Sequence, residues 1–324
     1  MRLIASEHRS DGARRLLDIV ATQLRIIAAA PRTGLLYLRA HPLALPAVLF
    51  SRLLGCKVIL EVNGSGDDVF IAHPGTAVLR PLLSRAGSLQ YRLTNHVVTV
   101  TPGLARLMAA KISAGKITAL TNGAPLRLSS LAQEPGRPPV VIFFGELASW
   151  QGIETVLAAK ASGHWPDGVR LEIIGSGSMA SAAETAAQSD PTLTFRGRLP
   201  QAEVHERVAE SYATLSVQSG RVRRNLHGVA PLKVAESLML GTPVILSDLG
   251  GHSDVLKGVG YRWIVPADSP VELAEMVGAL VAETDAGTVR RDAISAIAQE
   301  NLSWEAIGKK TADLIEGVIA ETAA

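Results

Sequence analysis

The chain alternates short, continuously apolar segments with longer segments in which apolar residues recur every three or four positions. The short segments have the composition of buried strands, and the longer ones have the period of a helix. The pattern predicts strands at Leu35–Leu38, Val58–Val62, Val97–Thr101, Ile117–Leu120, Val140–Phe144, Leu171–Ile174, Thr192–Phe195, Thr214–Val217, Pro243–Leu246 and Arg262–Val265. It predicts helices at Asp11–Ala30, Ala47–Leu54, Leu104–Ala110, Ile153–Ala161, Ala182–Gln188, Glu203–Glu210, Leu232–Leu240 and Val271–Val281. Apolar strands separated by helices indicate an α/β fold whose parallel sheets are covered on both faces.

The predicted strands form two series, and the segment between them has the composition of a linker. Residues 126–139 are rich in Ser, Gly and Pro, which favour turns and irregular structure. We therefore expect two Rossmann-like domains with a cleft between them. The first would cover residues 1–125, and the second would follow a linker over residues 126–139.

Composition excludes several classes of protein. The chain has 324 residues, of which 47% are hydrophobic and 19% are charged, so it can bury a substantial core. Its single cysteine, Cys56, cannot close an internal disulfide, and no Cys and His residues have metal-ligand spacing. A reducing cytoplasm is therefore the expected location. No apolar run approaches the ~18 residues that a membrane span needs. Aromatic residues make up only 4%, so we expect no stacking platform for nucleic acid.

The net charge of +2 hides an asymmetry between the two halves. Residues 1–125 contain 15 Lys and Arg and 6 Asp and Glu, whereas the remainder contains 17 and 24. The basic first half is expected to meet an anionic partner, either a membrane surface or an acidic ligand. The helix predicted at Asp11–Ala30 fits an interfacial basic helix. The alternatives are that this helix packs on a sheet and that the arginines are ordinary surface residues.

The stretch from Gly228 to Glu236 (GVAPLKVAE) has the features of an anion site. Pro231 suits the first position of a helix, where its missing N–H leaves no hydrogen bond unmade. The amides of Leu232–Val234 would then point out of the helix start at the carboxyl edge of a sheet, which suits a diphosphate. Lys233 adds a positive charge, and Glu236 can accept hydrogen bonds from a ribose. The alternative is a surface helix with a solvated Lys and Glu.

Residues 231–251 (PLKVAESLMLGTPVILSDLGG) resemble the donor-binding signature of family 4 retaining glycosyltransferases, which have the GT-B fold. Other segments match this family in the same order, and together they cover residues 34–320. They are VTVTPGL at 98–104, ALTNG at 119–123, FGELASWQGI at 144–153, IIGSGS at 173–178, FRGRLP at 195–200 and SWE at 303–305. The resemblance implies that residues 140–302 bind the donor and that residues 303–324 form a helix crossing back to the first domain.

Within the family, the chain is most similar to polysaccharide-building members with W-Q-G, P-L-K and E-V-N-G segments, here at 150–152, 231–233 and 61–64. Such enzymes transfer a sugar with retention from a nucleotide-sugar to a saccharide or lipid-linked acceptor, and they use no metal. The resemblance implies the same here, in exopolysaccharide or cell-surface glycan synthesis. No cofactor is expected, and a UDP-sugar is expected in preference to a GDP-sugar. The location would be cytoplasmic or peripheral on the inner face of the membrane.

Spacing and resemblance together define the candidate residues. Arg39, His41, Asn63 and Gly64 lie at or after the ends of the first two strands and are expected on the acceptor side. Glu236, Lys233 and Arg39 are the catalytic candidates. The expected donor-binding residues are Gly145, Gln151, Gly152, Gly175, Gly197, Arg198, Gly228, Val229, Ala230, Pro231, Leu232, Lys233, Val234 and Glu236.

The chain departs from the family at several positions. Many members have two glutamates separated by seven residues, but here Gly228 stands at the first position and Glu236 at the second. The Arg and Lys of the first donor loop correspond to Glu146 and Gln151. The family's opening strand and glycine-rich loop are not recognisable in residues 1–33. Compensating positive charge is expected from Lys233, Arg198 and the cluster Arg221, Arg223 and Arg224.

These departures leave two alternatives to sugar transfer. One is a non-catalytic binding or scaffold subunit that has kept the fold. The other is a sugar-nucleotide epimerase of similar two-domain shape, which would convert the donor without an acceptor.

Overall fold

The computed structural model describes residues 12–64, 74–131 and 133–321. The chain divides into two compact units, Met1–Leu120 with Thr311–Ala324, and Thr121–Lys310. The second unit therefore begins before the expected linker. That segment starts with the 3-10 helix η5 (Leu126–Leu131), and its Leu128 is fully buried in the core of the second unit.

The described part of the first unit is a four-stranded parallel sheet in the order β1-β2-β3-β4. The strands are β1 (Leu35–Arg39), β2 (Lys57–Val62), β3 (His96–Thr99) and β4 (Ile117–Ala119). The helices are α1 (Gly12–Ala29), α2 (Leu45–Leu53), α4 (Arg80–Leu93), α5 (Pro102–Ala109) and the end of α13 (Trp304–Ala320), with 3-10 turns η1 (Ala30–Arg32), η2 (Pro42–Ala44), η3 (Pro74–Leu79) and η4 (Ala114–Lys116). The opening strand of the family has no counterpart in residues 12–32, which form α1 and η1; residues 1–11 lie outside the described residues.

Alternation along β2 shows how the helices cover this sheet. Val58 and Leu60 point to one face, where they pack with Val48 of α2. Ile59 points to the other face and packs with Val318 of α13. The Lys57 ammonium donates hydrogen bonds to the carbonyl oxygens of Val318 and Ile319, at 2.6 and 2.7 Å. A cation at the C-terminal end of a helix stabilises both its carbonyls and its dipole.

Helix α1 packs on the neighbouring helix α2. The amide of Ala47 in α2 donates to the side-chain oxygen of Gln23 at 3.1 Å, and Ile26 of α1 is buried. One side of α1 nevertheless remains exposed, including Leu17 and Leu24.

The described part of the second unit is a six-stranded parallel sheet in the order β10-β9-β8-β5-β6-β7. The strands are β5 (Val140–Glu146), β6 (Arg170–Ser176), β7 (Leu193–Gly197), β8 (Ala213–Ser216), β9 (Val244–Ser247) and β10 (Ile264–Val265). The helices are α6 (Ile153–Ala161), α7 (Ala180–Ser189), α8 (Gln201–Glu210), α9 (Leu232–Met239), α10 (His252–Gly258), α11 (Pro270–Asp285), α12 (Arg291–Leu302) and the start of α13, with η6 (Ser149–Gln151) and η7 (Arg223–Asn225).

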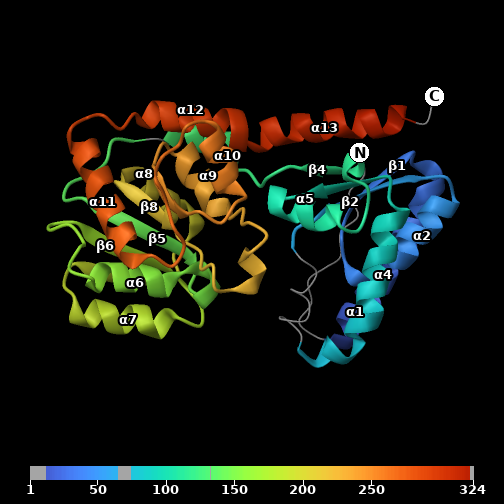
Figure 1. Cartoon of the computed structure of the whole chain (residues 1–324), viewed down its shortest axis with the longest axis horizontal. Coiled ribbons are helices and arrows are strands. Elements are labelled where there is room, and N and C mark those ends of the chain that lie inside the picture. Colours follow the sequence, from blue (N-terminus) through green and yellow to red (C-terminus); the bar gives the residue numbers. More distant parts are fainter. Residues whose placement is uncertain (1–11, 65–73, 132, 322–324) are drawn as a thin grey trace. The chain divides into compact units, whose positions relative to one another are not determined.

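The strand order of this unit reverses between β5 and β8. Helices α6 and α11 pack together in one layer, and α8, α9 and α12 pack together in another (Figure 1). In such doubly wound sheets, ligands bind at the carboxyl ends of the strands where the order reverses. The topology therefore directs attention to the ends of β5 and β8.

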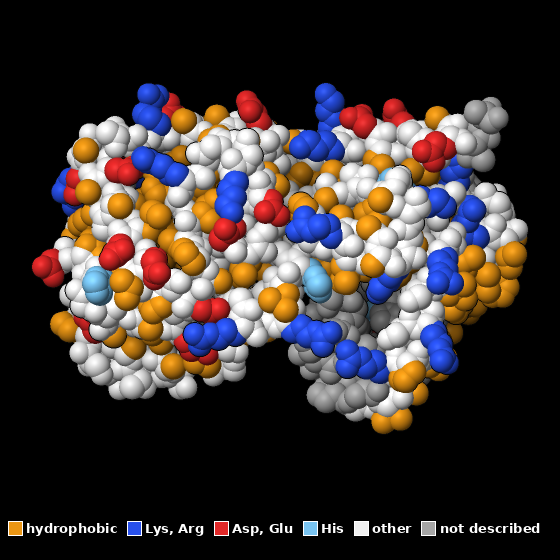
Figure 2. Space-filling view, viewed as in Figure 1, with side chains coloured by type: hydrophobic (Ala, Val, Ile, Leu, Met, Phe, Trp, Pro, Cys, Tyr) orange, Lys and Arg blue, Asp and Glu red, His pale blue; other side chains and the backbone are white. Residues whose placement is uncertain are grey.

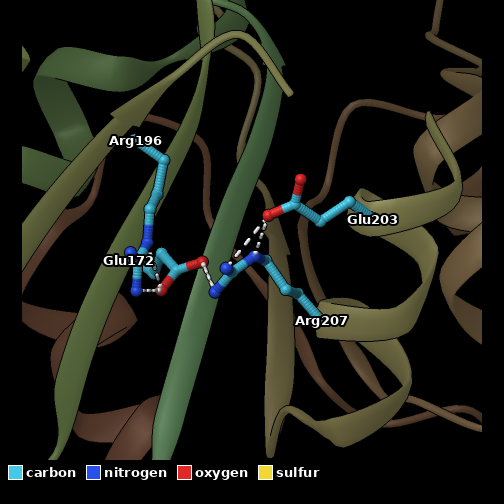
Figure 3. Close-up of polar contacts among 4 residues, drawn as sticks. All are labelled: Glu172, Arg196, Glu203 and Arg207. Atoms are coloured by element: carbon cyan, nitrogen blue, oxygen red, sulfur yellow. Dashed lines mark hydrogen bonds and ion pairs between the residues drawn. The ribbon is translucent and has the colours of Figure 1, made fainter. Parts of the chain in front are cut away.

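A charged network fastens α8 to this sheet (Figure 3). Glu172 of β6 is 7% exposed, and its carboxylate accepts from the guanidinium groups of Arg196, at 3.1 Å, and Arg207 of α8, at 3.3 Å. Arg207 also donates to Glu203, one turn earlier in α8, at 3.0 Å. Charge-assisted bonds of this kind position the helix because each oxygen of the buried carboxylate has a partner.

The structure confirms all ten predicted strands and the two-unit α/β fold, with strand ends differing by one or two residues. Helices α4, α10 and α12 were not predicted.

Candidate functional site

Two glycines face each other near the carboxyl ends of β5 and β6, one position before the terminal residues Glu146 and Ser176. Gly145 of β5 lies in register with Gly175 of β6. Gly175 has a φ of +150°, and a Cβ atom there would lie 1.8 Å from the carbonyl oxygen of Gly145. Only glycine fits such a close approach of two backbones. The predicted donor residues Gly145 and Gly175 are thus neighbours, at a place where a ligand can approach the main chain.

Lys233, the second residue of α9, reaches the same edge from the neighbouring element. Its ammonium lies 4.3 Å from the ring centroid of Phe143 in β5, and a Cβ at Gly145 would lie 3.9 Å from Nζ. The residue is 7% exposed, and Nζ has no hydrogen-bond partner among the described residues. The aromatic face gives partial compensation for the charge. An unpaired buried ammonium at the end of β5 indicates a site for an anion.

Burial lowers the pKa of Lys233 from its usual value to about 7. The cause is desolvation, which disfavours the charged form. A phosphate oxygen beside Nζ would restore the charged form, because an opposite charge in a site of low dielectric stabilises it. The group is therefore poised to gain a proton when an anion binds.

The start of α9 differs from the prediction in two ways. Pro231 is the N-cap residue, with φ −70° and ψ 132°, and not the first helical residue. Its carbonyl accepts the amide of Val234 at 3.1 Å, so this amide is not available to a ligand as expected. The amides of Leu232 and Lys233 precede the first helical hydrogen bond and have no acceptor inside the helix. They remain the backbone donors at this end.

Hydrogen bonds from other segments hold the loop that leads into α9. Gly228 has a φ of +86°, and Val229 forms a parallel bridge with Gly251, its carbonyl accepting from the amide of His252 at 3.1 Å. The Asn122 side-chain amide donates to the carbonyl of Ala230 at 2.8 Å.

Asn122 and His252 were missed as site residues by the sequence interpretation. The imidazole Nε2 of His252 lies 3.0 Å from the carbonyl oxygen of Asn122. Burial lowers the pKa of His252 to about 4, so the ring is neutral and Nε2 donates this bond. The ALTNG segment that ends in Asn122 and Gly123 was the available signal, since it was singled out by resemblance without a role.

Glu236 is directed toward α8. Its Oε1 lies 3.4 Å from the side-chain nitrogen of Gln201, which donates to it, and 3.8 Å from Nε2 of His205. Gln201 is the first residue of α8 and follows the loop after β7. Glu236 therefore lies at the edge that includes Gly197, the last residue of β7, and the exposed Arg198 that follows it.

The first donor loop is tied down by buried polar contacts. Gln151 is 7% exposed, and its carbonyl oxygen accepts from Gln218 at 3.3 Å. This amide therefore faces the interior and not an open site. Gly152 has a φ of +77°, and a Cβ there would lie 1.7 Å from the carbonyl oxygen of Val217. The loop after β5 and the loop after β8 are in backbone contact at the point where the strand order reverses.

The arginine cluster packs on the same loop. The guanidinium of Arg224 lies 4.2 Å from the ring centroid of Trp150. Asn225 is buried and donates to the carbonyls of Trp150 and Ser219, both at 2.8 Å. Arg221 approaches Asp268 at 4.0 Å. These contacts fix the loop that precedes Gly228.

In the first unit, the Glu61 carboxylate is bonded to one predicted acceptor-side residue, Asn63, and Glu61 lies in register with another, Arg39. Arg39, exposed at the end of β1, is in register with Glu61 of β2. Glu61 accepts from the side chains of Asn63 and Tyr37, both at 2.9 Å. Sequence reasoning missed Tyr37 and Glu61, although Glu61 belongs to the E-V-N-G segment. Burial and this carboxylate raise the pKa of Tyr37, so the hydroxyl keeps its proton.

The other two acceptor-side candidates have simpler surroundings. His41 is the N-cap of η2, and its Nδ1 accepts from the amide of Leu43 at 3.2 Å. The neighbouring Pro42 is the first residue of this turn. Gly64 follows Asn63 at the end of the described segment and is half-buried.

We expect Lys233→Met to stabilise the ligand-free protein in a pH-dependent way. The folded-state pKa of about 7 lies below the ordinary value of 10.5, so burying the charged form opposes folding. This cost is complete below pH 7 and disappears as the pH rises toward 10.5, which makes it on the order of 4 kcal/mol at pH 6. Urea unfolding at pH 6 and pH 10 would measure the difference between variant and wild type.

The exposed Lys257, which pairs with Asp248 at 2.6 Å, provides the matched control Lys257→Met. This control should not gain stability at pH 6. Equal stability of Lys233→Met and wild type at pH 6 would contradict the description of Lys233 as an unpaired buried cation.

Within residues 12–64, 74–131 and 133–321, no helix is both long and apolar enough to cross a membrane. In the same ranges, no group of three or more His, Cys, Asp and Glu residues has an arrangement suited to a metal ion.

Comparison with known proteins supports the resemblance found in the sequence. Residues 138–283 match the model of the family described as glycosyl transferases group 1. A GDP-mannose-dependent alpha-mannosyltransferase of Mycobacterium tuberculosis (strain CDC 1551 / Oshkosh) is 33% identical over 122 residues, which are 38% of this chain and 29% of the relative. A D-inositol 3-phosphate glycosyltransferase of Xylanimonas cellulosilytica is 26% identical over 186 residues, 55% of this chain and 42% of the relative. The alignments thus span less than half of either relative.

Solved structures confirm the predicted GT-B fold. HepE of Anabaena, crystallised in complex with UDP, has a TM-score of 0.71 at 15% identity, covering 92% of this chain and 82% of that one. Sucrose-phosphate synthase of Thermosynechococcus elongatus has a TM-score of 0.72 at 17% identity, covering 97% and 81%. HepE was also crystallised with UDP-glucose.

Proposed function

We propose that this chain, whose residues 138–283 match the model of the group 1 glycosyl transferases, transfers a sugar from a nucleotide-sugar to a saccharide or lipid-linked acceptor. The proposal includes retention at the anomeric carbon, independence of metal and a UDP-sugar as donor. It places the activity in polysaccharide or cell-surface glycan synthesis at the cytoplasmic side of a membrane.

The buried ammonium of Lys233 is the observation that carries the proposal. It lies at the reversal of the strand order, beside the glycine edge formed by Gly145 and Gly175 and the amides at the start of α9. Together these groups supply one positive charge and two helix-start amides beside a pair of glycines. A diphosphate matches this combination in charge and in its number of acceptor oxygens.

The same groups explain what the site contributes to the reaction. Cleavage of the bond between the sugar and the diphosphate leaves negative charge on the departing phosphate. A buried cation and fixed amides stabilise that charge as it develops, and they do so more strongly than in water. The leaving phosphate can itself accept the proton of the attacking hydroxyl in a front-face reaction. No carboxylate general base among the described residues is required for this step.

Glu236 and Arg198 give the nucleoside a place along the same edge. Glu236 has one carboxylate oxygen near Gln201 and His205, and it lies one turn of α9 beyond Lys233. A ribose diol beside it would form hydrogen bonds to the carboxylate. The support for UDP as the nucleotide is that HepE, which shares this fold, was crystallised with UDP and with UDP-glucose.

A binding or scaffold function is the second candidate, and two observations favour it. Gly228 stands where many members of the family have a glutamate, and Gln151 faces the interior, where it pairs with Gln218. A protein with these two changes can keep the diphosphate site without completing the transfer. An epimerase has no comparable support from the site.

A thermal-shift series with UDP, GDP and their sugar conjugates tests the proposal. A ligand present at 100 times its Kd stabilises the folded state by about 2.7 kcal/mol, which raises the Tm by roughly 5 °C or more. We expect this shift with UDP and a UDP-sugar in wild type and not in Lys233→Ala. Subsequent release of UDP in the presence of acceptor would distinguish transfer from binding. If no nucleotide shifts the Tm, the site assignment is wrong; binding without turnover would favour the scaffold.

A further inference from the structure

Three neighbouring helices of the first unit expose large apolar side chains. Helix α1 packs on α2, and α2 packs on α4. The most exposed of these side chains are Leu53 of α2 at 72%, Leu17 of α1 at 69% and Leu82 of α4 at 64%. Figure 2 shows hydrophobic side chains gathered over the region of α2, with Lys and Arg beside them. Large apolar side chains exposed on neighbouring helices indicate an interaction site.

The exposed residues follow the helical repeat, so each helix presents its own strip. In α1 they are Leu17, Val20 and Leu24, separated by three and four residues. In α4, Leu82 and Leu89 lie two turns apart, with Arg85 on the same side between them. The α2 strip consists of Phe50, Leu53 and the following Leu54. We call these eight apolar residues, together with the exposed Arg25, Arg85 and Arg92, the leucine–arginine face.

The charge on these helices has almost a single sign. Their only acidic residue is Asp18 of α1. Their arginines are Arg14, Arg15, Arg25, Arg52, Arg80, Arg85 and Arg92. Arg25, Arg85 and Arg92 are exposed. The face therefore combines apolar strips with a strong positive potential.

We propose that the leucine–arginine face docks on the surface of an anionic lipid bilayer. Exposed leucines enter the boundary between headgroups and acyl chains, and the arginines pair with anionic headgroups. A second copy of the chain is a poorer occupant. In a symmetric dimer the same patch meets itself, so the arginines of the two copies would repel each other.

This docking needs only the first unit and is independent of sugar transfer. The face supplies two different contributions, apolar burial and charge. A single acyl chain or a few charges alone give only marginal, reversible binding, whereas two kinds of contribution together give stable attachment. Replacing the exposed leucines and replacing the exposed arginines should therefore each weaken the docking, in distinguishable ways.

Co-sedimentation of the full chain with vesicles tests the proposal without any nucleotide. We expect binding to vesicles of phosphatidylglycerol mixed with phosphatidylcholine, weak binding to phosphatidylcholine alone, and a loss of binding as salt is raised. Arg85→Ser and Arg92→Ser should each weaken binding about fivefold. Leu17→Ser, Leu24→Ser and Leu53→Ser should each weaken it about tenfold, with less dependence on salt.

Matched controls come from exposed residues of the second unit. Arg127→Ser and Val259→Ser remove an exposed arginine and a residue that is 40% exposed, and both should bind vesicles like wild type. Because every substituted side chain is exposed, the Tm should change little; a variant that unfolds is replaced by the corresponding Gln substitution. Lys233→Ala should keep vesicle binding, which separates this proposal from the catalytic one.

Three results would overturn the proposal. The first is equal binding to neutral and anionic vesicles, or none to either. The second is unchanged binding when the leucines and arginines of the face are replaced. The third is a dimer, detected by sedimentation equilibrium without lipid, that dissociates in Leu53→Ser, because the face would then bind a second copy.

Discussion

Lys233→Ala is expected to lower kcat/KM for sugar transfer by about 100-fold to 1,000-fold, the range for removing one fixed group that stabilises developing charge. The ammonium is the one cation that the described part of the second unit buries at the end of β5, where its Nζ lies against Phe143 and Gly145. Steady-state release of UDP from a UDP-sugar, with and without acceptor, would measure the loss. We expect a large part of the loss to be a lower kcat and not only a higher KM, because the negative charge grows as the bond breaks.

The exposed lysine of α10 again supplies the matched control. Lys257→Met removes a positive charge from the same unit, but its ammonium pairs with Asp248 at the surface, and turnover should stay within twofold of wild type. Lys233→Arg tests whether charge alone suffices, because a guanidinium keeps the positive charge but is larger and planar. Wild-type turnover in Lys233→Ala would disprove the assignment of this edge as the diphosphate site.

Gly175→Ala is expected to cause a large loss of stability, about 3–5 kcal/mol. Its Cβ would lie 1.8 Å from the carbonyl oxygen of Gly145, and the φ of +150° is a conformation that side chains rarely adopt. Because the obstructing atom belongs to the backbone of β5, it cannot rotate away. The strands must separate at the edge where the diphosphate is expected to bind. Urea unfolding monitored by circular dichroism would give the free energy of unfolding.

Gly168→Ala isolates the conformational part of this effect. Gly168 also has a positive φ, +73°, but a Cβ there meets no atom within 4 Å, so the cost should be about 1–2 kcal/mol. The difference between the two variants measures the steric contact. A Gly175→Ala protein as stable as Gly168→Ala would mean that β5 and β6 do not approach as closely as described.

Several residues of the candidate site could be singled out from the sequence because their signals are local. Lys233 and Glu236 follow a proline that begins a helix, and Gly145 and Gly175 follow apolar runs that read as strands. Each of these patterns depends on a few consecutive residues. What failed was detail at the helix start: Pro231 caps α9 from outside, so the amide of Val234 is bonded to its carbonyl and not available to the ligand.

Other features could not be predicted because they depend on residues far apart in the chain. Asn122 contacts Ala230 across 108 positions, and His252 contacts Asn122 across 130. The pairing of Gln151 with Gln218 is of the same kind. Helix α12 was not predicted, and its burial comes in part from packing on α9 and η5, which lie far from it in the chain. No window of sequence contains such information.

By itself the sequence determined the alternation of strands and helices, and with it the two parallel α/β units and the family signature. Hydrophobic periodicity and backbone preferences are properties of neighbouring residues, so they survive without any knowledge of the fold. Only the tertiary structure decided that Lys233 is buried with no hydrogen-bond partner in the described part of the chain, and that three helices leave leucines exposed. Both are matters of solvent access, which depends on what the rest of the chain covers. Elsewhere in the fold, a lysine would be solvated at the surface, and leucines with the same spacing would be buried in a hydrophobic core.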